Sequence, residues 1–273
     1  MDITDLRSKI NEIDDKMSDL FIERMKVSAD IGAYKLEHGM NIRDRKREKE
    51  VIDNLCAKVG DIYAPYISAL YEQIMEMSRR YQSYLQMIVQ IEYGLIGEDV
   101  SNSYSKWIHH SMGNRSFGLY SLPCEMLPLL FKKRAFKGIC IDSPYKQEVI
   151  KYCDELDRIA KTTGYVNTIV SEADGTILGY NTEYDGFASA VKKSGMELKG
   201  KKIMLLGKGS IASSIKEVLK DSGVSEILNV TRTGKINFRN YTEYKDADIV
   251  INATNIGMSP DSDIAPVDLS TFS

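Results

Sequence analysis

Several features that would assign a protein to a broad class at once are missing from this sequence. No apolar run approaches the ~18 residues that a membrane-spanning helix needs, and the N-terminus lacks the apolar core of a signal peptide. The four cysteines form no Cys-x-x-Cys pair, which fits free thiols in a reducing compartment. The net charge of −3 leaves no basic excess for a nucleic-acid backbone. We therefore expect a cytoplasmic protein that binds neither membrane nor nucleic acid.

Glycine and proline are scarce in the first third of the chain. Residues 1–88 hold three glycines and one proline, whereas residues 89–273 hold the other sixteen and five. Helices tolerate neither residue well and turns use both, so we expect a helical domain followed by a region of another kind. The length of 273 residues, with 43% hydrophobic and 27% charged residues, also favours two globular domains over a disordered or fibrous chain.

Apolar residues recur at spacings of three and four from Ile3 to Tyr34. The pattern predicts a helix over residues 3–38, which would be about 54 Å long. A globule of residues 1–88 is narrower than that, so the far end of the helix must pack elsewhere, most simply against a second copy. Arg24 alone interrupts the apolar seam. It is either a snorkelling side chain at the seam edge or a guanidinium held inside the bundle to bind an anion.

Two further helices are predicted, over residues 41–58 and 61–86. The apolar stripe of the first turns polar toward its N-terminal end, and two polar residues four apart lie beside the stripe of the second. These positions are Asp44, Arg47, Glu48, Ser78 and Gln82. A solvated charge cluster is the simpler interpretation. The alternative is a pocket for a hydroxylated polyanion, because the inward polar residues carry both signs.

Residues 1–88 resemble the all-helical chorismate mutase family over their whole length. The matching positions are Arg7, Arg24, Lys35, Asp44, Arg47, Glu48, Ser78 and Gln82. The resemblance implies an isomerase, an intramolecular transferase that converts chorismate into prephenate by a Claisen rearrangement. That reaction adds and removes nothing, so we expect no metal or cofactor in this domain.

The resemblance also implies a role for each side chain. Arg7 and Arg24 would hold the two carboxylates of chorismate, and Arg7 would reach the site of the partner subunit in a homodimer. Lys35 and Gln82 would donate hydrogen bonds to the ether oxygen, where negative charge develops in the transition state. The remaining positions would assist at the carboxylates (Arg47, Ser78) or position the substrate hydroxyl (Asp44, Glu48).

From residue 90 onward, short apolar runs alternate with helical patterns, as in an α/β sheet domain. Residues 201–230 then read as strand, glycine turn, helix and strand. The turn contains Gly207, Gly209 and Ser210, and it is either a plain βα turn or a dinucleotide-binding turn. The second strand ends in Thr231 and Arg232 rather than in an acidic residue, which favours NADP over NAD.

The region from about residue 92 resembles the shikimate dehydrogenase family. The matching segments are YGLIGEDVSNSYS, DSPYKQEV, GYVNTIV, GYNTEYDGF, the glycine turn and INATNIGM. The resemblance implies that Ser103 and Ser105 bind the carboxylate of shikimate, that Asn167 binds its hydroxyls, and that Lys146 is the catalytic lysine. Glu183 stands where the family has the aspartate paired with that lysine.

Other positions depart from the family pattern. Cys140 and Asp142 replace an asparagine and a threonine, and a carboxylate at 142 would repel the substrate carboxylate. Glu183 is one methylene longer than aspartate, Tyr184 follows it in place of glycine, and Ser210 replaces a glycine of the turn. The family also continues beyond the third strand of the cofactor domain, so we expect an incomplete Rossmann-type lobe here.

The predicted architecture is therefore multidomain. A three-helix, all-α chorismate mutase domain over residues 1–88 forms an intertwined dimer. An α/β, shikimate dehydrogenase-like substrate domain follows over 89–200, and a partial Rossmann-type NADP-binding lobe covers 201–273.

Three hypotheses follow for the function. The chain is a chorismate mutase whose second domain is weak or inactive as a dehydrogenase, or it is a bifunctional mutase and NADP-dependent shikimate dehydrogenase. Alternatively, the second domain senses a metabolite or mediates assembly.

Overall fold

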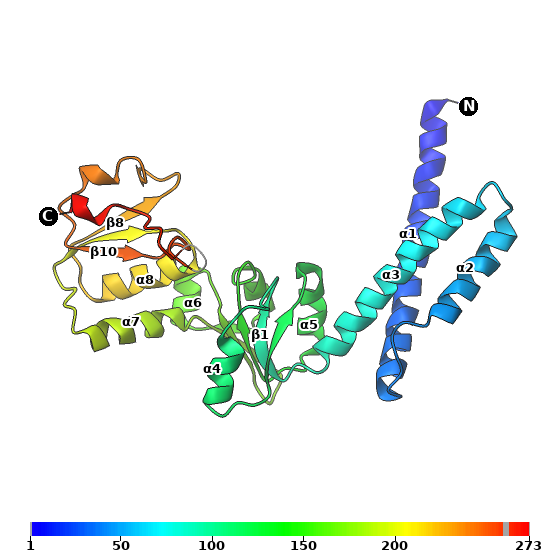
Figure 1. The fold of residues 1–273 in the computed structure, drawn as a ribbon, viewed down its shortest axis with the longest axis horizontal. Coiled ribbons are helices and arrows are strands. Elements are labelled where there is room, and N and C mark those ends of the chain that lie inside the picture. The colour runs from blue at the N-terminus through cyan, green and yellow to red at the C-terminus, as the bar shows by residue number, and fades with distance from the viewer. Residues whose placement is uncertain (1, 259–261, 273) are drawn as a thin grey trace. The chain divides into compact units, whose positions relative to one another are not determined.

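The computed structural model describes residues 2–258 and 262–272. The chain divides into two compact units, each described here by itself (Figure 1). Unit 1 comprises Met1–Ile91 with Pro128–Ala135, and unit 2 comprises Glu92–Leu127 with Phe136–Ser273.

Unit 1 is built from three long helices. Helix α1 spans Ile3–Glu37, α2 spans Arg45–Val59 and α3 spans Ala64–Ile88. All three predicted helices are confirmed, with shifted starts for the second and third. Helix α2 begins after its cap, because the Asp44 carboxylate accepts a hydrogen bond from the Arg47 backbone N–H at 3.0 Å.

The packing of α1 is uneven along its length. The residues that it buries are Ser28 and Gly32, which both lie in its second half. The apolar seam of its first half, from Ile3 to Leu20, is 46–65% exposed. Figure 1 shows the N-terminal end of α1 projecting beyond α2 and α3. An apolar seam with this exposure has no partner within the described part of the chain.

Unit 2 contains two sheets. The first has the strand order β2-β1-β3-β5-β6-β4, with β1, β2 and β3 parallel and β5 antiparallel to both of its neighbours. Its strands are β1 (Tyr93–Gly97), β2 (Phe117–Ser121), β3 (Gly138–Ile141), β4 (Glu155–Leu156), β5 (Thr168–Ser171) and β6 (Ile177–Tyr180). The helices that accompany them are α4 (Ser105–Ser111) and α6 (Arg158–Thr163), with short 3-10 turns at Cys124–Met126 and Glu148–Tyr152. Helix α5 (Leu127–Lys133) belongs to unit 1 except for its first residue.

The second sheet is parallel, in the order β10-β7-β8-β9. Its strands are β7 (Lys202–Leu206), β8 (Glu226–Thr231), β9 (Ile236–Asn237) and β10 (Ile249–Asn252), accompanied by α7 (Glu183–Ser194), α8 (Ser210–Asp221) and 3-10 turns at Tyr241–Glu243 and Leu269–Thr271. Buried aliphatic residues of β7 pack against α8 on one face and against β8 and Val267 on the other. The predicted strand–turn–helix–strand unit is confirmed, and the two-residue strands β4 and β9 were not predicted.

Candidate active site

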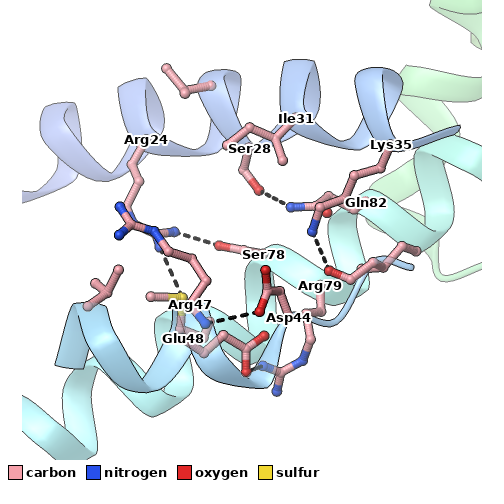
Figure 2. Close-up of a pocket in the computed structure, with 14 residues that line it drawn as sticks. Arg24, Ser28, Ile31, Lys35, Asp44, Arg47, Glu48, Ser78, Arg79 and Gln82 are labelled. Atoms are coloured by element: carbon pink, nitrogen blue, oxygen red, sulfur yellow. Dashed lines mark hydrogen bonds and ion pairs between the residues drawn. The ribbon is translucent and has the colours of Figure 1, made fainter. Parts of the chain in front are cut away.

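A cavity of about 380 Å³ lies among α1, α2 and α3, and Figure 2 shows its side chains converging from all three helices. It is lined by Arg24, Val27, Ser28, Ile31, Lys35, Ile42, Asp44, Arg47, Glu48, Val51, Met75, Ser78, Arg79 and Gln82. The structure thus brings together every predicted position of the helical domain except Arg7. Four basic and two acidic side chains line the cavity, so its charge suits a dianion.

Arg24 projects into this cavity without an acidic partner in the described chain. Its Nη1 donates to the Ser78 hydroxyl at 2.6 Å, and its Nη2 contacts the Met75 sulfur at 3.4 Å. The Ser78 hydroxyl donates in turn to the Ile74 carbonyl at 2.8 Å, so it accepts from Arg24 in a fixed orientation. A half-buried guanidinium held only by neutral groups keeps its charge available for an anion.

Glu48 is held by a basic residue that sequence reasoning missed. Arg79 Nη1 lies 2.8 Å from Glu48 Oε2, and the two side chains are 25% and 19% exposed. Arg43 approaches the same carboxylate oxygen at 3.9 Å. Arg79 directly follows Ser78 in a pair of arginines typical of a solvated surface. Its spacing of four from Met75 and three from Gln82 was the signal that could have separated it from Arg80. The ion pair joins α2 to α3 at the rim of the cavity.

Two hydrogen-bond donors stand on the other side of the cavity. Lys35 Nζ donates to the Ile42 carbonyl at 2.5 Å, and Gln82 Nε2 donates to the Ser28 hydroxyl at 2.9 Å. Gln82 and Ser28 are both buried, and the Gln82 carbonyl oxygen is buried without a hydrogen-bond partner in the described chain. Ser28 is a further lining residue that the sequence did not single out, because a serine in an apolar seam carries no charge signal.

Arg7 is the predicted residue that this cavity does not include. It is exposed and lies seventeen residues before Arg24 on the same straight helix, a rise of about 25 Å. An arginine side chain is far shorter than that distance. Arg7 therefore cannot reach the Arg24 cavity of its own chain.

In unit 2, the predicted residues meet at one edge of the first sheet. Because β1 and β3 are parallel and β5 runs antiparallel to β3, the segments that carry Ser103, Lys146 and Asn167 lie at the same end of these strands. Ser103 and Ser105 hydrogen-bond to each other at 3.0 Å. The Asn167 side-chain oxygen accepts from the Thr182 backbone N–H at 3.0 Å.

Lys146 and Glu183 form an ion pair at this edge. Lys146 Nζ lies 2.7 Å from Glu183 Oε1, and each side chain is 14% exposed. The other carboxylate oxygen, Oε2, accepts from the Ser210 hydroxyl at 2.6 Å and from the Ser214 hydroxyl at 3.1 Å. The Ser214 hydroxyl also bonds to Asn181, which is 1% exposed. Glu183 thus connects the lysine to the first turn of α8 through a buried polar network.

Two departures from the expected pattern lie near this edge. Burial raises the pKa of the Cys140 thiol, so the thiol stays uncharged at neutral pH. Asp142 accepts a hydrogen bond from the Ser143 backbone N–H at 2.7 Å. Cys140 is therefore a neutral group near this edge. Asp142 is a turn residue whose carboxylate is hydrogen-bonded to the neighbouring backbone.

The glycine turn after β7 has the form that a dinucleotide phosphate requires. Gly207 has φ +123°, and a Cβ there would lie 2.7 Å from the Ala253 carbonyl oxygen, so only glycine fits. Gly209 caps α8 with open space around its Cα, which allows close approach to the helix N-terminus. Thr231 ends the neighbouring parallel strand at the same edge, and Arg232 after it is exposed. These residues fit NADP, with the arginine available to the ribose 2′-phosphate.

Two features are absent from the described residues. No helix among residues 2–258 and 262–272 has both the length and the apolarity to cross a membrane. Over the same residues, no three histidine, cysteine, aspartate or glutamate side chains gather in a way that could hold a metal ion.

Comparisons with known proteins identify both parts of the chain. Two family models match, chorismate mutase type II over residues 6–83 and shikimate dehydrogenase substrate binding domain over residues 95–169. The shikimate dehydrogenase (NADP(+)) of Clostridium beijerinckii is 35% identical over 194 residues, which cover 64% of this chain and 72% of that protein.

Solved structures give a consistent result. A chorismate mutase/shikimate 5-dehydrogenase fusion protein from Clostridium acetobutylicum is 32% identical with a TM-score of 0.61, covering 66% of this chain and 73% of that one. A shikimate 5-dehydrogenase from Thermus thermophilus, in complex with NADP(H) and shikimate, is 26% identical with a TM-score of 0.58, covering 67% and 75%.

Proposed function

Since the chain belongs to the shikimate dehydrogenase family and carries a chorismate mutase type II domain before it, we propose that its helical unit rearranges chorismate into prephenate. The observation that carries this proposal is the Arg24 guanidinium, which faces the cavity with neutral partners only. Chorismate is a dianion, and the excess of basic over acidic side chains in the cavity suits it.

The rearrangement requires only that the protein position the substrate and stabilise the charge that develops in the transition state. Arg24 and Arg47 bind carboxylates, with Ser78 holding the Arg24 guanidinium, and this fixes the substrate in its reactive conformer. Lys35 and Gln82 lie on the opposite wall and donate to the ether oxygen as its bond to carbon breaks. The new carbon–carbon bond forms within the same molecule, so no group leaves and no proton is transferred.

The remaining polar residues serve the substrate hydroxyl. Glu48 keeps its carboxylate in place through Arg79, and Asp44 is fixed as the cap of α2. Both are acceptors at the rim on the α2 side of the cavity. An acceptor pair there distinguishes a hydroxylated ring from an aromatic carboxylate without a hydroxyl.

We propose further that the site is completed by a second copy of the chain. The exposed apolar seam of α1 needs a partner, and Arg7 cannot reach its own cavity. A symmetric dimer built through α1 satisfies both requirements, because each Arg7 then enters the cavity of the other protomer.

The second candidate function is NADP-dependent oxidation of shikimate by unit 2, and the Lys146–Glu183 pair favours it. Bound NADP would supply the hydride-transfer chemistry. Lys146, oriented by Glu183, is placed to exchange the proton of the reacting hydroxyl. Ser103, Ser105 and Asn167 bind the carboxylate and the other hydroxyls. Gly207, Gly209 and the α8 N-terminus hold the pyrophosphate, with Ser210, Thr231 and Arg232 beside the cofactor.

The positions of these two sites in the chain suggest the domain boundaries. We assign residues 1–88 to the mutase domain, 89–200 to the shikimate-binding domain and 201–273 to the NADP-binding lobe. The compact units of the structure part between Ile91 and Glu92, close to the first of these boundaries.

Both functions are tested on one preparation. The purified chain should convert chorismate into prephenate at the same rate with a chelator present and without NADP. Failure to do so would refute the mutase proposal. The same preparation should reduce NADP in the presence of shikimate. If it does not, a shift of the thermal midpoint by shikimate or NADP would identify unit 2 as a sensing module instead.

A further inference from the structure

The side chain of Gln82 lies in a cradle formed by two small residues of α1. Ser28 and Gly32 are the residues that α1 buries, and both contact Gln82 of α3. The Ser28 hydroxyl lies 2.9 Å from Gln82 Nε2. A Cβ on Gly32 would lie 2.9 Å from Gln82 Cγ and 3.2 Å from Gln82 Cβ.

The amide of Gln82 has little else to orient it. Its carbonyl oxygen is buried and has no hydrogen-bond partner among the described residues. Among the described residues, the hydrogen bond to Ser28 is therefore the one that sets the rotation of the Gln82 amide. An amide NH2 has two hydrogens, so one N–H can bind Ser28 while the second stays available to a ligand.

The glycine determines how closely α1 and α3 approach. Gln86, one turn after Gln82, donates to the Gly32 carbonyl at 3.1 Å and ties the two helices together there. A methyl group on residue 32 would crowd Gln82 Cγ and Cβ, so either the Gln82 side chain or the spacing of the two helices would have to shift. Glycine is a poor helix former compared with alanine, so local helix stability would favour alanine at this position.

We propose that Ser28 and Gly32 are positioning residues of the mutase reaction, which hold the Gln82 amide so that its free N–H faces the ether oxygen of the substrate. The inference rests on the proposed function of the helical unit. The proposal gives α1 two positioning residues in addition to Arg24 and Lys35, which contact the substrate. Ser28 sets the rotation of the amide and Gly32 leaves room for its side chain.

The test compares kcat and KM for chorismate in Ser28→Ala, Gly32→Ala and a control, Ser83→Ala, whose hydroxyl lies on the exposed face of α3. Misplacing one transition-state donor should lower kcat by about tenfold, less than the ~100-fold expected for removing it. KM should stay within about twofold, because the carboxylate-binding arginines are untouched. Ser28→Cys, which keeps a weak acceptor of similar size for the Gln82 N–H, should recover part of the lost kcat.

Folding is monitored by the thermal midpoint of each variant. Gly32→Ala should lower kcat more than Ser83→Ala does, and its thermal midpoint measures how far the clash with Gln82 offsets the gain in helix propensity. Ser28→Ala removes an oxygen without adding volume, so its interpretation does not depend on how Gly32→Ala folds.

A second readout uses the pH profile of Gln82→Glu, in which only a protonated carboxyl donates. The Ser28 hydroxyl can donate to the ionised carboxylate and lower its pKa. Adding Ser28→Ala should therefore move the alkaline loss of activity to higher pH. If kcat of Ser28→Ala equals that of Ser83→Ala and the pH profile does not move, the inference is wrong. If the unmodified protein has no mutase activity, both the inference and the proposed function are overturned.

Discussion

The two sites differ in how their charges are satisfied. In the helical unit, Arg24 and Lys35 bind only neutral groups among the residues that the structure describes, and Arg7 lies too far away to take part. In unit 2, Lys146 is already paired with Glu183, whose second oxygen is bound by Ser210 and Ser214. The first site leaves its cations free for an anion, whereas the second is an internally closed network.

This difference matches what each reaction asks of the protein. A rearrangement needs uncompensated positive charge and donors placed where charge develops. A hydride-transfer site must instead keep a lysine oriented so that it can exchange a proton, and the paired carboxylate does this. Unpaired charge in one site and paired charge in the other are therefore both consistent with function.

The closed network also changes the meaning of two departures from the family pattern. Glu183 and Ser210 each differ from the residue that the family has, and the structure brings their side chains to 2.6 Å. The longer carboxylate spans from Lys146 to the first turn of α8, and the hydroxyl at 210 meets it there. The two departures compensate each other.

The largest expected effect comes from removing the unpaired charge. Arg24→Ala should lower the kcat/KM for chorismate by about 10³-fold, because a charge-assisted contact to the substrate is lost. Shikimate oxidation should stay unchanged in the same preparation. Arg80→Ala, on the exposed face of α3, is the matched control and should retain full mutase activity. Retention of that activity by Arg24→Ala would remove this guanidinium from the site.

The next largest effect should come from disrupting the proposed dimer, which the mutase site needs and the shikimate site does not. Ile10 is 57% exposed on the apolar seam of α1. Ile10→Asp should dissociate the dimer and lower mutase activity by roughly 100-fold, since each cavity loses one arginine. Sedimentation and both assays check the prediction. A monomer with full mutase activity would show that Arg7 of a partner is not used.

The pH dependence tests the donor on the cavity wall. Gln82 needs no added proton to donate, so the unmodified site should keep its activity through neutral pH. In Gln82→Glu the donor exists only below the pKa of the new carboxyl, so activity should be lost as pH rises through that value. Burial would raise this pKa above the ordinary ~4.3. A variant with a flat profile from pH 4.5 to about 8 would argue against contact with the ether oxygen.

The smallest effect concerns the closed network. Ser210→Gly removes the 2.6 Å hydrogen bond to Glu183 and should lower shikimate oxidation by about fivefold, with mutase activity unchanged. Ser213→Ala on the same helix serves as the control. An unaltered rate in Ser210→Gly would mean that Lys146 alone positions the longer carboxylate.

The sequence predicted those features that depend on the spacing of residues along a helix. Helix periodicity placed Arg24, Ser78 and Gln82 on or beside the apolar stripes, and the family resemblance added Lys35. The structure brings all four to one cavity. The same periodicity gave the helices to within a few residues, apart from starts that depend on a cap such as Asp44.

The rest depended on contacts between distant segments. Ser28 and Gly32 look like ordinary small residues of an apolar seam, and only the packing of α3 shows that they lie against Gln82. Arg79 shares the helix face of Met75 and Gln82, but its role as the partner of Glu48 depends on where α2 packs. Strands β4 and β9 are two residues long, which is too short for any alternation to show.

The central claim is that the mutase site is shared between two chains, and mixing two inactive variants tests it directly. Arg7→Ala and Arg24→Ala are each purified, unfolded together and refolded. In a mixed dimer, one cavity combines Arg24 of the first variant with Arg7 of the second, so about a quarter of all cavities become complete after random pairing. The account predicts recovery of about that fraction of the normal activity. A mixture as inactive as its two components would contradict it.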